Sequence, residues 1–137
     1  MKYLFSAVVF AMLCGSVLAA QNTKERLAGK AALAWLSLVD TGEYEKSWEQ
    51  ASLLFRKQVP ARQWKTAITS VRTPLGKLVS RKLKSTQFTT TLPGAPDGEY
   101  VVIQYDCSYE KKKSAVETVT PMREEDGSWK VSGYYIR

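Results

Sequence analysis

Few residues of this chain could do acid–base or nucleophilic chemistry, and none has the spacing of a known catalytic group. The absence of histidine excludes mechanisms that need an imidazole base or an imidazole metal ligand. Asp40 and Tyr44 are at helical spacing, but Asp40 is expected at a helix end, where a structural role is typical. Tyr105 and Asp106 are neighbours in a strand pattern, so their side chains point to opposite faces and cannot share a site. These observations favour a binding protein over an enzyme.

Cofactor and metal motifs are also missing from the sequence. It contains no zinc-ligand spacing, phosphate-binding loop, dinucleotide-binding glycine pattern or calcium loop, so we expect neither a cofactor nor a metal. Cys107 falls in an alternating apolar pattern and is expected to be a buried small hydrophobic residue. A nucleophilic or redox role for Cys107 is the alternative, but it would have no histidine partner.

Arg81 is the basic residue whose predicted position is unusual. It alternates with Val79 and Leu83, so it faces the helices if these apolar residues do. A buried charge without a partner is costly, and either Glu117 or an anionic ligand could neutralise it. A bulge, or a side chain that reaches solvent, would remove that need. The hypothesis is a pocket for a small anion or an acyl chain end, with the candidate ligand-binding residues Arg81, Tyr105, Trp48 and Glu117.

The first 20 residues have the pattern of a secretory signal peptide. Lys2 precedes an apolar run over residues 3–13, and small residues follow over 15–20. At about 1.5 Å per residue the run spans about 16 Å, roughly half of a ~30 Å hydrocarbon core, so no permanent membrane span is expected. We place cleavage near Ala20 and the protein in the periplasm or outside the cell. Lipidation of Cys14 is an alternative, although the preceding residue is Leu13 rather than a small one.

Cleavage would leave one domain over residues 21–137. Only Lys2 is lost from the 137 residues and the net charge of +7, so 117 residues at +6 remain. A chain of this length can bury a sufficient core. Cys107 would be its single cysteine, so no internal disulfide can stabilise the fold.

Two periodicities divide this domain. Apolar residues follow helical spacing from about residue 23 to 73, and they predict three helices. The first is expected to bury Leu27, Ala31, Ala34, Trp35 and Leu38, and its apolar stripe is widened by Ala28, Ala32 and Val39. The second carries Tyr44, Trp48 and Ala51 or Ser52 on one side. The third, after Pro60, turns Trp64, Ile68 and Val71 inward.

After Gly76 the period changes to two. Four strands are predicted over residues 77–91, 99–109, 114–123 and 128–137. The short connections favour an antiparallel meander. The prediction is an α+β fold in which three N-terminal helices pack on one face of a curved four-stranded sheet, with a cavity between the two layers.

Several segments resemble a known family. They are residues 34–44 (AWLSLVDTGEY), 72–83 (RTPLGKLVSRKL), 92–102 (LPGAPDGEYVV), 115–120 (AVETVT) and 129–137 (WKVSGYYIR). Together they are similar to small secreted bacterial proteins catalogued as domain of unknown function 4019, over essentially the whole mature chain. The family brings no catalytic or binding residues with it. The order of elements also resembles the nuclear transport factor 2-like or cystatin-like fold, which carries enzymes, binding proteins and scaffolds alike.

Residues 51–96 contain nine basic residues and no acidic one. A basic surface there would bind an anionic partner such as lipid headgroups, lipopolysaccharide, a cell-wall polymer or an acidic protein. Alternatively, the acidic residues 124–126 fold back beside it and the surface is mixed. Nucleic acid is not expected as a partner, because the destination is outside the cytoplasm and no binding motif is present. Besides Arg81, the candidate surface comprises Arg56, Lys57, Arg62, Lys65, Arg72, Lys77, Lys82 and Lys84.

Three functional hypotheses follow. The first is a periplasmic or secreted binding or accessory protein that engages an anionic envelope component, or a small ligand in the cavity between helices and sheet. The second is a small-molecule enzyme that uses tyrosine and carboxylate chemistry. The third is a structural protein that forms a homodimer through the open face of the sheet.

Overall fold

The computed structural model describes the backbone of residues 5–137 and the side chains from Val17 onward. Helices come first and strands follow, which confirms the predicted α+β class. The elements are α1 (Phe5–Asp40), α2 (Tyr44–Glu49), α3 (Leu53–Gln58), α4 (Ala61–Arg72), the short 3₁₀ helix η1 (Thr73–Leu75), β1 (Leu78–Thr89), β2 (Tyr100–Tyr109), β3 (Lys112–Arg123) and β4 (Trp129–Ile136).

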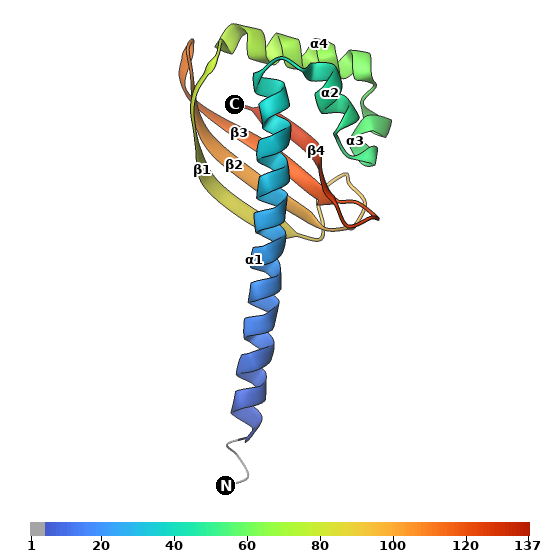
Figure 1. The fold of residues 1–137 in the computed structure, drawn as a ribbon, viewed down its shortest axis with the longest axis vertical. Helices are drawn as coiled ribbons and strands as arrows, with labels where there is room; N and C mark the ends of the chain where they lie inside the picture. The colour runs from blue at the N-terminus through green and yellow to red at the C-terminus, as the bar shows by residue number, and fades with distance from the viewer. Residues whose placement is uncertain (1–4) are drawn as a thin grey trace.

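The strands form one curved antiparallel sheet in the order β1-β2-β3-β4. This is the predicted meander, and each strand lies within three residues of its expected bounds. Figure 1 shows α1 crossing one face of the sheet and its N-terminal part extending beyond the domain, with α2, α3 and α4 grouped near the other end of α1. The helices therefore cover one face, as expected from the order of helices and then strands.

The expected second helix is divided into α2 and α3. The break occurs at Ser52, whose hydroxyl accepts a hydrogen bond from the backbone of Phe55 at 3.0 Å and so caps α3. The Ser52 amide donates to the carbonyl of Val131 in β4 at 2.8 Å. A buried serine that joins a helix start to the sheet thus makes four helices where periodicity predicted three.

The inward faces of α1 and α4 agree only in part with those predicted. In α1 the fully buried positions are Leu36 and the three residues expected to widen the apolar stripe, Ala28, Ala32 and Val39. Leu27 and Ala34 are exposed instead, because the alanine stripe at four-residue spacing lets α1 pack closely on the sheet. In α4 the inward series steps by four from Trp64 to Ile68 to Arg72, and Val71 is exposed.

Aromatic side chains join the helical layer to the sheet. The Trp35 ring centroid lies 5.8 Å from that of Trp64 and 5.3 Å from that of Tyr134 in β4. Both indole N–H groups donate to Ser47: Trp35 to its carbonyl at 2.8 Å and Trp64 to its hydroxyl at 2.9 Å. Trp35 and Trp64 are therefore core residues, as predicted. Tyr135 is exposed, as its opposite parity to Tyr134 requires.

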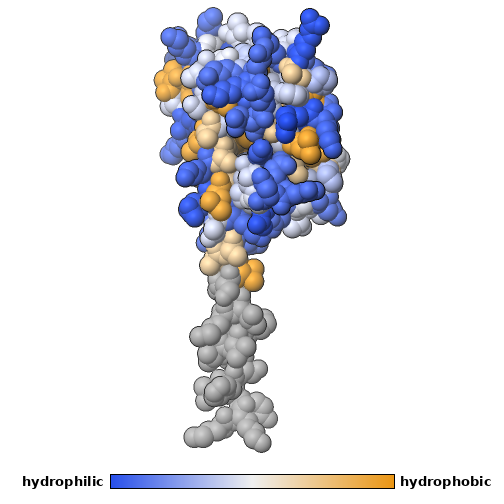
Figure 2. All heavy atoms as spheres, turned by 45° about the vertical axis from the view of Figure 1, so that its right-hand side comes forward, coloured by the Kyte–Doolittle hydropathy of each residue, from blue (hydrophilic) through white to orange (hydrophobic). Residues whose placement is uncertain are grey.

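The domain surface drawn in Figure 2 is mostly hydrophilic, and its hydrophobic residues form small separate groups. Val17 and Leu18, near the N-terminal end of the described side chains, are exposed. Within the described part of the chain, no helix combines the length and the apolar character that crossing a membrane requires.

Candidate functional site

Arg81 points into the layer between helices and sheet because of a bulge in β1. The bulge lies between Leu78, which pairs with Tyr109, and Ser80, and Arg81 then pairs with the buried Cys107. The expectation that Val79 faces the helices is wrong, since its side chain is 66% exposed. The inward direction predicted for Arg81 is nevertheless the one observed, because the extra residue keeps Leu78 and Arg81 on the same face.

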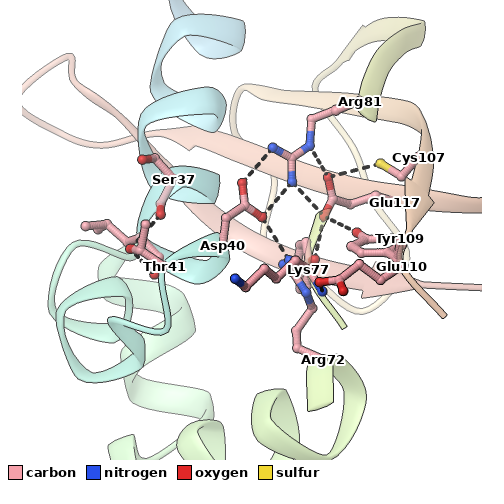
Figure 3. Close-up of polar contacts among 12 residues, drawn as sticks. Ser37, Asp40, Thr41, Arg72, Lys77, Arg81, Cys107, Tyr109, Glu110 and Glu117 are labelled. Atoms are coloured by element: carbon pink, nitrogen blue, oxygen red, sulfur yellow. Dashed lines mark hydrogen bonds and ion pairs between the residues drawn. The ribbon is translucent and has the colours of Figure 1, made fainter. Parts of the chain in front are cut away.

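The Arg81 guanidinium is held by two carboxylates (Figure 3). Its Nε donates to Oε1 of Glu117 at 2.7 Å and its Nη2 to Oε2 at 3.2 Å. Its Nη1 and Nη2 donate to the two carboxylate oxygens of Asp40 at 2.8 and 2.9 Å. Burial disfavours the charged form, but these hydrogen bonds outweigh it and raise the pKa of Arg81 above its usual range. The protein itself therefore neutralises Arg81, and no ligand is needed for that purpose.

Asp40 is placed by the end of α1. The helix stops at this residue, and Gly42 follows in the left-handed region with φ of 78°. The Gly42 amide donates to the Val39 carbonyl at 3.1 Å, which closes the last turn. The position of Asp40 at a helix end predicted a structural role, but helical spacing gave no sign of its ion pair with Arg81.

Glu117 is completely buried and accepts further hydrogen bonds from β2 and β4. The hydroxyls of Tyr109 and Tyr134 donate to its Oε2 at 3.2 and 2.6 Å. The Cys107 thiol lies 3.7 Å from Oε1. Burial and the neighbouring Glu117 raise the pKa of Cys107 to about 11 and raise those of both tyrosines. Cys107 is thus a buried, protonated thiol at neutral pH, as predicted.

Arg72 was expected on the basic surface and is instead buried, with 6% of it exposed. Its Nη2 donates to Asp40 at 3.0 Å, and its guanidinium carbon lies 5.1 Å from the centre of the Tyr109 ring. Its Nε and Nη1 are buried without a hydrogen-bond partner among the described residues. The four-residue step from Ile68 was the sequence signal that could have placed Arg72 inward.

The four candidate ligand-binding residues do not form one group. Arg81 pairs with Glu117, and its guanidinium carbon lies 5.9 Å from the centre of the Tyr105 ring. Trp48 belongs to a different surface hollow beside α4, where its indole donates to the Val59 carbonyl at 2.7 Å. The structure brings Arg81, Glu117 and Tyr105 together and places Trp48 apart from them.

The remaining basic candidates lie among acidic neighbours. Lys65 pairs with Glu45 at 3.1 Å. Lys57 borders a hollow that also contains the acidic residues 124–126, and Lys84 lies 3.9 Å from Asp106. Arg56 is half-buried against Trp48. Arg62 lines a hollow with Glu45 and Glu49, the Lys77 amide donates to Glu110 at 2.9 Å, and Lys82 pairs with Asp106 across β1 and β2. The surface therefore has mixed charge.

An open groove lies between α1 and the edge strand β1. Its volume is about 340 Å³, at the lower end of the range of about 300 to 1,000 Å³ for small-molecule sites. Leu33 and Leu83 stand exposed on either side of it. The full lining is Asn22, Glu25, Arg26, Gly29, Leu33, Leu83, Thr86, Ile103 and Tyr105.

Other hollows are less suited to a small ligand. One of about 520 Å³ is lined only by residues 60–67 at the start of α4, and one of about 440 Å³ has mostly charged residues around it. A hollow of about 380 Å³ between α1 and β4, which includes Trp35 and Trp129, resembles the groove in having both helix and sheet in its lining. The groove differs from it in that its exposed lining surface is more strongly apolar. In the part of the chain that the structure covers, no three acidic or cysteine side chains lie close enough to bind a metal ion.

Comparison of the sequence with known protein families gives a match. The family described as "Protein of unknown function (DUF4019)" matches residues 31–134. The chain belongs to this family. The match includes the whole Arg81 network, whereas the groove residues 22–29 precede it. Among curated proteins there is no match. Among solved structures, a putative ketosteroid isomerase from Shewanella frigidimarina is similar, with 18% identity and a TM-score of 0.47 over 81% of this chain and 94% of that chain.

Proposed function

We propose that this DUF4019 protein is a secreted, periplasmic binding protein that holds a small ligand in the groove between α1 and β1. The observation that carries the proposal is the groove itself. Its apolar lining includes two leucines, Leu33 and Leu83, that are half exposed although they flank the buried side chains of Ile103 and Tyr105. A bound molecule with apolar surface would remove these leucines from water, which is favourable.

The buried ion pairs of Arg81 are not themselves a binding site, because protein carboxylates already occupy the guanidinium. Four hydrogen bonds already engage the Arg81 guanidinium. The Tyr105 ring lies 5.9 Å from the Arg81 guanidinium carbon, lines the groove and is almost completely buried. Rigid side chains at the base of a site lower the entropic cost of binding.

The contacts of α1 support export with removal of residues 1–20. Residues 17–20 are exposed, whereas Lys24, four residues further along α1, contacts the sheet. The Lys24 ammonium forms an ion pair with Glu99 and lies 5.1 Å from the centre of the Phe88 ring. Cleavage near Ala20 would therefore leave the packed part of α1 intact.

Native mass spectrometry of the protein recovered from the periplasm tests this function. We expect a retained small molecule in the wild type and its loss in Leu83→Glu. Val79→Glu is the matched control, because Val79 is an apolar residue of the same strand, is similarly exposed and does not line the groove. Circular dichroism should show both variants folded. Equal retention in Leu83→Glu and Val79→Glu, or none in the wild type, would contradict the proposal.

A further inference from the structure

We propose that the ligand of the groove is an uncharged amphiphile, with an aliphatic body between Leu33 and Leu83 and a carbonyl or hydroxyl oxygen that accepts a hydrogen bond from Tyr105. This inference rests on the proposed function and adds the ligand's chemical class. It also assigns Tyr105 as the residue that selects the polar end of the ligand.

Tyr105 differs from the other buried tyrosines in its hydroxyl group. Tyr100 donates to the Pro96 carbonyl at 2.6 Å, and Tyr109 donates to Glu117 at 3.2 Å. Tyr105 has 4% of its surface exposed, and no described residue partners its hydroxyl. The hydroxyl is not among the buried polar atoms that lack a partner, so it reaches solvent. Because Tyr105 lines the groove, a ligand there could accept the hydrogen bond that the hydroxyl otherwise gives to water.

The protonation state of Tyr105 makes its hydroxyl a donor. Burial raises its pKa, and this effect exceeds the opposing influence of Arg81. The hydroxyl is therefore protonated at neutral pH and can donate to a ligand oxygen. Thr86, a second hydroxyl in the lining, can act as donor or acceptor.

The charges around the groove favour a neutral ligand. Glu25 and Arg26 are the charged residues of its lining, and they have opposite signs. Behind Tyr105, the positive charge of Arg81 is matched by carboxylates at 2.7 and 2.8 Å. Arg26 is exposed and forms no ion pair within the described part of the chain, but Glu25 leaves the lining without net charge. The lining therefore has no net positive charge to offset the cost of taking a carboxylate or phosphate out of water.

Octanamide and octanoate at pH 7.5 are suitable probes, because they share a chain and differ in charge. Binding to the ¹⁵N-labelled protein is followed by amide chemical shifts. We expect octanamide to shift residues of the groove and to bind about ten-fold more tightly than octanoate. Tyr105→Phe should weaken octanamide binding three- to ten-fold, about the contribution of one neutral hydrogen bond. Tyr135→Phe, at an exposed tyrosine outside the groove, should change the binding of neither probe.

The outcomes separate the two proposals. If both probes shift the groove but octanoate binds equally or more tightly, or Tyr105→Phe leaves octanamide affinity unchanged, the inferred ligand class is wrong and the groove remains a binding site. If neither probe shifts the groove residues, both the ligand class and the proposed function are overturned.

Discussion

Replacing Arg81 with methionine should destabilise the fold far more than replacing Arg72 with methionine. Glu117 is completely buried, and Arg81 is the cation that hydrogen-bonds it, through two nitrogens at 2.7 and 3.2 Å. Arg81→Met would leave Glu117 with neutral hydroxyl donors alone. Removing one member of a buried ion pair costs about 3 to 5 kcal/mol, a large share of the ~5 to 15 kcal/mol by which domains are stable.

Arg72→Met should cost no more than about 1 kcal/mol. Asp40 keeps its two hydrogen bonds from Arg81, so no carboxylate loses its last cation. Arg72 contributes one hydrogen bond to Asp40 and a contact with the Tyr109 ring. The contact is worth about 0.5 to 1 kcal/mol or somewhat more when buried, and methionine retains part of it through sulfur–aromatic contact. Removing Nε and Nη1, which lack partners, offsets the remaining loss.

Urea unfolding of the two variants measures this difference. The free energy of unfolding is compared by circular dichroism and tryptophan fluorescence, with coincident transitions as the check on two-state behaviour. Adding Glu117→Gln to Arg81→Met should recover part of the lost stability, because the buried charge is then gone. Equal losses for Arg81→Met and Arg72→Met, or a loss below about 1 kcal/mol for Arg81→Met, would refute the assignment of Arg81 and Glu117 as a coupled buried pair.

Three further predictions concern stability. The pKa of Cys107 is raised to about 11 in the fold from about 8.5 in an unfolded chain, so stability is intact below pH 8.5 and falls as the pH rises toward 11. Urea titrations at several pH values should show that the free energy of unfolding falls less between pH 8.5 and 11 for Cys107→Ala than for the wild type. Ser52→Ala removes the α3 cap and should cost about 1 kcal/mol, measured by the same titration. A chain that starts after Ala20 should have the melting temperature of the full chain, and a clear decrease would show that residues 1–20 stabilise the domain.

The architecture could be predicted because it depends on local patterns. The change from helical to alternating periodicity at Gly76 separated the two layers, and short connections required an antiparallel meander. The division between α2 and α3 was missed because it depends on a contact of Ser52 with Val131 in β4. The buried side of α1 was predicted in part, because Ala28, Ala32 and Val39 belong to the expected stripe. Leu27 was misplaced because it is as apolar as a core residue, while small alanines fill the closest contact with the sheet.

The site was predicted only in part because its members come from distant segments. Strand alternation placed Arg81 inward and offered Glu117 as a partner, and both are observed. The bulge in β1 and the second carboxylate, Asp40, could not be inferred from periodicity. The groove forms where α1 packs beside an edge strand, and a local sequence pattern does not reveal such packing. The strand pattern turned Leu83 toward the helices, and it gave no sign that this leucine is exposed at a groove.

The most direct test of the binding groove is Gly29→Leu. A β-carbon at Gly29 meets no atom within 4 Å, and Gly29 lines the groove, so leucine would fill the binding space without disturbing the core. Leucine is also favoured over glycine within a helix by up to about 1 kcal/mol. We predict that octanamide titrations followed by amide chemical shifts show binding to the wild type and none to Gly29→Leu, with stability equal or higher. Undiminished octanamide binding to a folded Gly29→Leu protein would contradict the account.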